Sequence, residues 1–233
     1  MSRSRSNSTS SSSSDDFDKD YADGTYMDHR GFRAEALMAL ADVYQYKEAD
    51  PMDEFGFPKI AEDWELSQFW YDNETGDKVI DFIANYVNMR ENCNVACIST
   101  PSIYKAYLRN KNKVPRATFT LFEYDTRFQS TGVNFTFYDL NKPEMVLEKY
   151  IHLFDLLIID PPFLSEDTTD KVYKTAQLIA KPNECEIVYV TGLKVEEWLK
   201  KCYSNIQLTD VSVRHEHLLK NPFGLFSTKV PLI

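Results

Sequence analysis

A short apolar run that ends at a carboxylate and two prolines constrains the fold more than any other feature. Residues 154–159 hold five apolar side chains in six, and Asp160, Pro161 and Pro162 follow at once. Such a run is typical of a central strand of a parallel sheet, buried on both faces. The prolines donate no N–H, so the carbonyl group of Pro161 can accept a hydrogen bond beside the Asp160 carboxylate and near the Phe163 ring. We therefore predict an amine site formed by Asp160, Pro161 and Phe163.

Strands and helices are predicted to alternate on both sides of this run, which implies a parallel sheet with right-handed crossovers. The predicted strands cover residues 95–99, 117–123, 134–138, the run that ends at Asp160, 186–191, 207–215 and 225–230. The predicted helices cover about 32–47, a segment from Asp72 or Thr75 to 87, a segment opened by Pro101, 165–180 and 195–202. The last two strands follow the pattern of an antiparallel hairpin.

The chain is long enough for one folded domain and a tail. Residues 1–30 are rich in Ser, Arg and Asp and too poor in apolar side chains to offset their ordering entropy, so we expect a disordered tail. The folded domain would then span 31–233. We divide it into an N-terminal helical cap and cofactor-side segment at 31–92 and a Rossmann-like core at 93–233.

Removal of residues 1–30 is expected to leave catalytic activity and the melting temperature nearly unchanged, because this segment has little to contribute to a core. Activity assays and thermal unfolding of the shortened chain check this. A large loss of either quantity would show that the tail docks on the domain.

The net charge of -10 argues against a nucleic-acid partner. The tail holds four basic and six acidic residues, so the remainder still carries -8. An acidic domain repels phosphate backbones and favours a basic protein partner. A local basic cluster is the counter-evidence, and its members are Lys105, Arg109, Lys111, Lys113 and Arg116.

Neither a membrane nor a metal site is expected. No stretch approaches the roughly 20 apolar residues of a membrane span, and the N-terminus lacks an apolar signal core, so we expect a cytoplasmic protein. The four cysteines form no C-x-x-C pair and indicate free thiols in a reducing compartment. His215 and His217 share a strand face but have no evident third ligand.

Four segments carry a resemblance to a known family. They are Leu66-Ser67-Gln68-Phe69-Trp70-Tyr71, residues 122–128, residues 135–139 and residues 160–165, in which Asp160-Pro161-Pro162-Phe163 fits the [D/N]-P-P-[F/Y] signature of amino-methylating enzymes. The chain resembles the elongation factor 1-alpha lysine methyltransferase 1 family, once grouped with N6-adenine DNA methyltransferases. The resemblance implies a class I α/β fold: a Rossmann-like seven-stranded sheet with an antiparallel C-terminal strand, plus an N-terminal helix. It also implies the cofactor S-adenosyl-L-methionine.

The glycine-rich turn that many class I methyltransferases have after the first strand is missing. The first strand runs instead into Ser99-Thr100-Pro101-Ser102. We expect Pro101 to open a helix, and Ser99 or Thr100 to cap it and to donate a hydroxyl to the amino-acid end of the cofactor. Ser99, Pro101 and Ser102 are therefore candidate cofactor-binding residues.

Acidic side chains at the ends of successive strands complete the predicted cofactor site. Glu123 ends the second strand, where a carboxylate can accept hydrogen bonds from both ribose hydroxyls of the cofactor. Asp125 is the neighbouring candidate for the same role. Asp139 ends the third strand, where it could meet the adenine amine. Phe69 and Trp70 could supply aromatic surface over the same crevice.

Three functions remain open from the sequence. The motif indicates an amino acceptor without saying which one. The first hypothesis is a protein-lysine methyltransferase that acts on translation elongation factor 1-alpha, with the substrate implied by the resemblance alone. The second is an N6-adenine methyltransferase on DNA or RNA, against which stand the acidic charge and the lack of an inserted base-recognition domain. The third is a Rossmann module that binds without catalysis, suggested by the lost glycine loop.

Overall fold

The computed structural model describes residues 51–229, other than 64, 131, 218 and 220. The expected tail and the helix predicted at 32–47 lie outside the described residues. In the part of the chain that is described, none of the helices combines the length and the apolar character that crossing a membrane requires.

The described strands form one seven-stranded sheet in the order β3-β2-β1-β4-β5-β7-β6. Their bounds are β1 Cys93–Ile98, β2 Ala117–Glu123, β3 Phe135–Phe137, β4 Leu156–Ile159, β5 Glu186–Gly192, β6 Gln207–Ser212 and β7 Phe223–Ser227. Strands β1 to β5 pair in parallel, and β7 runs antiparallel to both β5 and β6. The predicted seven-stranded sheet with a reversed C-terminal strand is confirmed.

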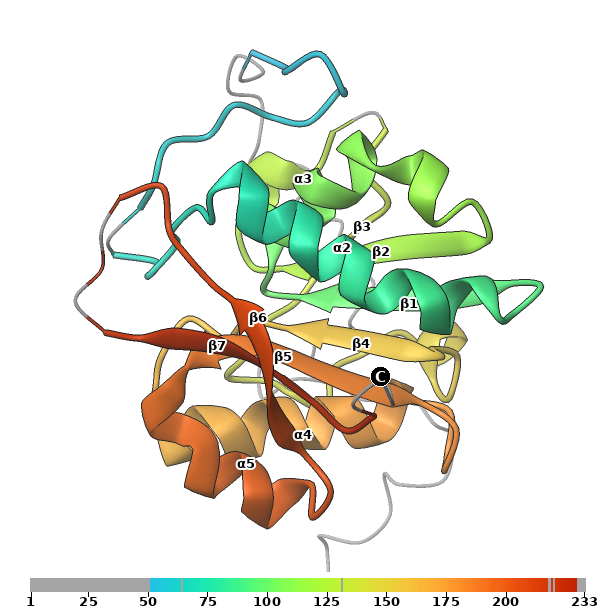
Figure 1. Cartoon of the computed structure of the whole chain (residues 1–233), viewed down its shortest axis with the longest axis vertical. Coiled ribbons are helices and arrows are strands. Elements are labelled where there is room, and N and C mark those ends of the chain that lie inside the picture. The colour runs from blue at the N-terminus through green and yellow to red at the C-terminus, as the bar shows by residue number, and fades with distance from the viewer. Residues whose placement is uncertain (1–50, 64, 131, 218, 220, 230–233) are drawn as a thin grey trace, which may run out of the picture.

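Helices cover both faces of the sheet, with α2 and α3 on one face and α4 and α5 on the other (Figure 1). Their bounds are α2 Asn73–Asn88, α3 Pro101–Arg109, α4 Glu166–Ile179 and α5 Glu196–Cys202, with 3-10 turns η1 Lys111–Lys113, η2 Thr126–Phe128, η3 Glu148–Tyr150 and η4 Leu193–Val195. Side chains of β1 alternate between the two layers: Val95 and Cys97 pack with α2 and α3, and Ala96 and Ile98 pack with α4 and α5. The sheet is thus buried on both faces.

Local sequence signals fix the helix starts as predicted. The Asp72 carboxylate accepts a hydrogen bond from the backbone N–H of Thr75 and caps α2. Ser165 caps α4 in the same way through the N–H of Thr168, and Pro101 occupies the first turn of α3. These signals set where the segments that precede the three helices stop.

The strand order places the crevice of the fold between β1 and β4. The chain leaves β1 toward β2 on one side and returns from β3 to β4 on the other, so the carboxyl ends of β1 and β4 flank the switch point at which open α/β sheets bind ligands. Ser99 directly follows β1, and Asp160 directly follows β4. Their backbones lie close, because the N–H of Asp160 donates to the carbonyl of Ile98 at 3.1 Å.

The segment before α2 is attached to the connection between β6 and β7. Tyr71 forms an antiparallel bridge with His215, the N–H of Asp72 donates to the Arg214 carbonyl at 3.1 Å, and the N–H of Glu216 donates to the Trp70 carbonyl at 2.8 Å. This attachment brings the residues that precede α2 to the carboxyl end of the sheet (Figure 1).

Candidate active site

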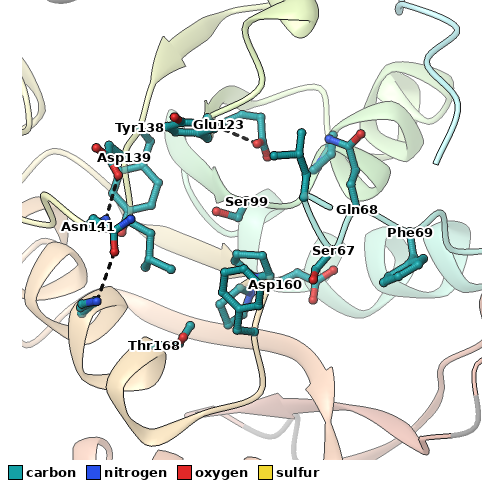
Figure 2. Close-up of a pocket in the computed structure, with 18 of the residues that line it drawn as sticks. Ser67, Gln68, Phe69, Ser99, Glu123, Tyr138, Asp139, Asn141, Asp160 and Thr168 are labelled. Carbon is teal, nitrogen blue, oxygen red and sulfur yellow. Dashed lines mark hydrogen bonds between the residues drawn. The ribbon is translucent and has the colours of Figure 1, made fainter. Parts of the chain in front are cut away.

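A pocket of about 540 Å³ lies at the carboxyl ends of the strands, and we name it the first pocket. Its volume falls within the range typical of small-molecule sites. The strand ends and the segment before α2 both contribute to its wall (Figure 2). Its lining residues include Ser67, Gln68, Phe69, Ser99, Glu123, Asp139, Asn141 and Asp160.

The first pocket brings together nine of the eleven residues that the sequence proposed. They are Phe69, Ser99, Pro101, Ser102, Glu123, Asp139, Asp160, Pro161 and Phe163. Trp70 and Asp125 do not line it. Trp70 is 8% exposed, donates from Nε1 to the Ile60 carbonyl at 3.0 Å and packs edge-on against Phe57. Neighbouring side chains of an extended segment point in opposite directions, so Phe69 faces the pocket and Trp70 the core.

Asp125 is engaged by its own loop. It caps η2, and its carboxylate accepts from Nη2 of Arg127 at 2.6 Å and from Nε2 of Gln68 at 3.4 Å. The side chain is 5% exposed. Of the two candidates for the ribose, only Glu123 therefore lies on the pocket wall.

Glu123 presents one carboxylate oxygen to the pocket. Its Oε1 accepts from the backbone N–H groups of Tyr124 at 2.8 Å and Asp125 at 3.1 Å, while Oε2 has no hydrogen bond among the described residues. Burial raises the pKa of Glu123 to about 7; the two N–H donors oppose this rise, and the charge of Asp125 adds to it. A buried carboxylate with a free oxygen suits a ligand that brings hydroxyl donors.

The end of β3 adds a polar edge that includes residues the sequence did not single out. Asp139 accepts from the backbone N–H of Asn141 at 2.9 Å, and Asn141 in turn accepts from Nζ of Lys171 at 3.2 Å (Figure 2). Tyr138 lines the pocket with its hydroxyl held by Thr175 at 2.9 Å. Asn141 and Lys171 come from a loop and a helix, so no local motif connects them.

The turn after β1 keeps the backbone shape of a glycine loop without a glycine. Ser99 has a φ of 50°, in the left-handed region that favours glycine. The expected cap was wrong: the N-terminus of α3 has no side-chain cap, and Thr100 Oγ1 is buried without a partner among the described residues. Ser102 serves the fold, because its hydroxyl accepts from the N–H of Tyr71 at 3.2 Å.

A second pocket of about 570 Å³ adjoins the first across the amine site. Both pockets are lined by Ser67, Phe69, Asp160, Pro161, Pro162 and Phe163. The second pocket is also lined by Lys194, His215 and Phe223, among others. Asp160 thus lies where a molecule in one pocket would meet a molecule in the other, and Phe163 is still 52% exposed between them.

Asp160 has an unusual environment for a carboxyl group. Burial raises its pKa to about 8; a hydrogen bond from Tyr71 opposes the rise, and the charge of Glu123 adds to it. The Tyr71 hydroxyl donates to Oδ2 of Asp160 at 2.7 Å. A hydrogen bond between Tyr71 and Asp160 could not be predicted from the sequence, because the two residues lie 89 positions apart.

Of the histidines and cysteines that the structure describes, only His215 lines either pocket. Among the described residues no group of three or more His, Cys, Asp and Glu side chains could hold a metal ion. His215 packs on the Tyr71 ring with centroids 4.6 Å apart, and burial lowers the pKa of His215 to about 4. The four cysteines are free thiols, as predicted.

Comparison with known proteins shows one family. The sequence profile described as "Probable N6-adenine methyltransferase" matches residues 62–230. A protein-lysine N-methyltransferase of Dictyostelium discoideum is 38% identical over 81% of this chain and 86% of its own length. Protein-lysine N-methyltransferase EFM5 of Saccharomyces cerevisiae is 32% identical over 83% and 82%, and EEF1A lysine methyltransferase 1 of Homo sapiens is 34% identical over 83% and 89%.

Solved structures share the fold at low sequence identity. A branched-chain polyamine synthase from Thermus thermophilus, solved with N4-aminopropylspermidine and 5'-methylthioadenosine, is similar with a TM-score of 0.56 and 12% identity. The match covers 83% of this chain and 62% of that one. At this identity the likeness supports the Rossmann-like architecture alone.

Proposed function

Because this chain belongs to the family described as "Probable N6-adenine methyltransferase", we propose that it is an S-adenosylmethionine-dependent protein-lysine N-methyltransferase that acts on translation elongation factor 1-alpha. One observation carries the proposal: relatives named for lysine methylation, among them EEF1A lysine methyltransferase 1 of Homo sapiens, align over most of this chain and of their own length. The region that the family profile matches, residues 62–230, includes the residues that line both pockets. A cytoplasmic location follows from the proposed substrate.

The first pocket fits the cofactor in size and in its polar groups. Glu123 Oε2 would accept from the ribose hydroxyls, Asp139 would accept from the adenine amine, and Ser99 would face the amino-acid end. Gln68 Oε1 is a buried acceptor on the pocket wall without a partner among the described residues, and it could accept a hydrogen bond from the cofactor. When bound, the cofactor supplies a methyl group on a sulfonium.

The amine site would prepare the acceptor. A lysine side chain entering through the second pocket would pass Phe163 and reach Asp160, which lies in both pockets. Bringing a lysine of pKa about 10.4 to the neutral form at pH 7 costs roughly 4 to 5 kcal/mol. With a pKa of about 8 in the free protein, Asp160 is mostly neutral at pH 7, and the positive charge of an entering ammonium favours its ionised form. The carboxylate then holds the ammonium and can take its proton. The Pro161 carbonyl would be a second acceptor for the amine.

The affinity for S-adenosylhomocysteine is expected to rise about tenfold from pH 6 to pH 8 and then level off. The pKa of Glu123 is about 7 in the free protein, and ribose hydroxyls donate to its ionised form, so binding favours loss of its proton. This ligand lacks the sulfonium charge, which keeps Asp160 largely out of the measurement. Calorimetric titration across the pH range checks it.

The matched control is Glu123→Gln, in which the rise should flatten because the group no longer titrates. A wild-type affinity that falls with pH, or a variant that keeps the full rise, would contradict the role of Glu123.

The second candidate is methylation of an adenine amine, which the family description itself favours. An exocyclic adenine amine could occupy the same amine site, so the motif alone does not exclude it. Charge weighs against it, because the chain carries -10 and part of the basic cluster is paired with acidic side chains of α2. Arg109 pairs with Asp77 at 2.6 Å, and Lys113 pairs with Asp81 at 2.6 Å.

Transfer of labelled methyl groups into a cell lysate separates these functions. We expect the label to survive nuclease treatment, to disappear with protease, and to lie on a lysine of elongation factor 1-alpha by mass spectrometry. Label lost to nuclease would favour the adenine function. Calorimetric binding of S-adenosylhomocysteine tests the third hypothesis, since a module that binds this ligand but transfers no methyl group to any lysate component would be non-catalytic.

A further inference from the structure

The buried hydroxyl of Tyr71 contacts the carboxyl group at the junction of the two pockets. Tyr71 is 5% exposed, and its Oη lies 2.7 Å from Oδ2 of Asp160 and 3.3 Å from the carbonyl oxygen of Val190 on β5. The Tyr71 hydroxyl has one proton to donate, and two acceptors lie within its reach, Oδ2 of Asp160 and the carbonyl oxygen of Val190. Its hydrogen bond therefore depends on whether Asp160 carries a proton.

Tyr71 is fixed from several sides before any ligand arrives. Its N–H donates to Ser102 at the start of α3, and its backbone bridges to His215. Its ring packs on His215 with centroids 4.6 Å apart and lies 6.4 Å from the ring of Phe223. A hydroxyl held in this way can orient its partner at little further entropic cost.

We propose that Tyr71 is a positioning residue for methyl transfer: its hydroxyl holds Oδ2 of Asp160 so that Oδ1 faces the acceptor amine, and it turns to the Val190 carbonyl when Asp160 takes up a proton. This inference rests on the proposed function, because it assigns Tyr71 to the same amine site. It adds a residue outside the D-P-P-F motif.

The acceptor ammonium would give one proton to the Asp160 carboxylate and become an amine. The amine lone pair would then form a C–N bond to the methyl carbon as the C–S bond breaks, so that the nitrogen becomes a methylammonium with the positive charge and the sulfonium becomes a neutral thioether. Ionised Asp160 accepts a hydrogen bond from the Tyr71 hydroxyl. Neutral Asp160 can instead donate to the Tyr71 oxygen, and the Tyr71 hydroxyl then donates its hydrogen bond to the Val190 carbonyl oxygen. Each protonation state of Asp160 thus has a partner, which lowers the cost of switching between them.

Other ionisable groups face the same region and must stay constant in a test. Glu123 shares the first pocket and raises the pKa of Asp160 through its charge. His215 packs on Tyr71, but with a pKa of about 4 its ring is neutral near pH 7. The remaining charged groups on the two pockets are Glu65, Asp139, Asp167, Lys171 and Lys194. Tyr71→Phe leaves all of these side chains in place.

The test is Tyr71→Phe, with Tyr104→Phe as the matched control. Tyr104 is also buried, and its hydroxyl accepts from the backbone N–H of Asn134 at 2.8 Å, away from both pockets. In Tyr71→Phe we expect kcat to fall about 10- to 100-fold with KM changed less, because a hydrogen bond to a charged group is lost. The acidic limb of the pH profile of kcat should move up by about one pH unit. Tyr104→Phe should move neither quantity.

A direct titration of Asp160 separates this inference from the proposed function. Carbon-13 NMR of the labelled Asp160 carboxyl in the free protein needs no substrate, and its midpoint should rise in Tyr71→Phe. An unshifted midpoint in the folded variant, or a pH profile that superimposes on wild type, would overturn the role of Tyr71 even if lysine methylation is established. If Tyr71→Phe does not fold, 3-fluorotyrosine at position 71, a stronger donor, should lower the midpoint, and an unchanged or raised midpoint would overturn the role equally.

Discussion

Asp160→Ala is expected to abolish methyl transfer, and Asp160→Asn to lower it about 100- to 10,000-fold, the range associated with a positioned proton acceptor. The amide of asparagine can accept a hydrogen bond but can neither attract an ammonium by charge nor store its proton. Affinity for S-adenosylhomocysteine should change little, because the cofactor's hydroxyls and adenine are assigned to Glu123 and Asp139. Initial rates on elongation factor 1-alpha and calorimetric titration measure the two effects.

The control for charge on the first pocket is Asp167→Asn, which removes a carboxylate at the start of α4 whose side chain is 75% exposed and pairs with Lys171. Its activity should stay near that of wild type.

Thermal unfolding checks the fold of Asp160→Asn. The pKa of Asp160 is raised by folding to about 8, so ionisation costs folded stability as pH rises from about 4 to 8. Asp160→Asn, which has no carboxyl group to ionise at this position, should then be no less stable than wild type at pH 7. Near-normal turnover by folded Asp160→Ala would contradict the assignment of Asp160 to the amine site.

The parts of the fold that depend on local sequence could be predicted from it. The run that became β4 is apolar because it is buried on both faces, and Asp72, Pro101 and Ser165 mark helix starts through local hydrogen bonds or a fixed φ. The acids at strand ends were found for the same reason: a parallel sheet gathers its carboxyl ends at one edge.

What the sequence could not supply depends on contacts between distant segments. Phe69 and Trp70 are neighbours of similar chemistry, and the direction of the segment, set by the bridge between Tyr71 and His215, sends one to the pocket and the other to the core. The hydrogen bond of Tyr71 to Asp160 and the contact of Asn141 with Lys171 have the same origin. Ser99 is a different case. The sequence has serine where many class I methyltransferases have glycine, but the backbone at this position keeps the left-handed conformation that glycine favours.

Glu123→Ala is expected to weaken cofactor binding roughly 10- to 100-fold, because hydrogen bonds to a charged group are worth about 1.5 to 3 kcal/mol. The alanine variant also removes the acceptor for the N–H groups of Tyr124 and Asp125, so part of its effect could come from a loosened loop. Glu123→Gln isolates the charge, since its amide oxygen can still accept from both N–H groups. We expect the glutamine variant to lose about tenfold.

Asp125→Ala decides which acid serves the ribose, and calorimetric titration of all three variants makes the comparison. Its carboxylate is taken up by Arg127 and by the cap of η2, and it does not line the first pocket, so its loss should act only through the loop and Gln68. We expect a smaller loss of affinity than for Glu123→Ala. If Asp125→Ala is the more damaging of the two, the ribose lies two residues further along the chain than proposed. If neither variant changes the affinity, the cofactor is not held by the end of β2, and the assignment of the first pocket fails with it.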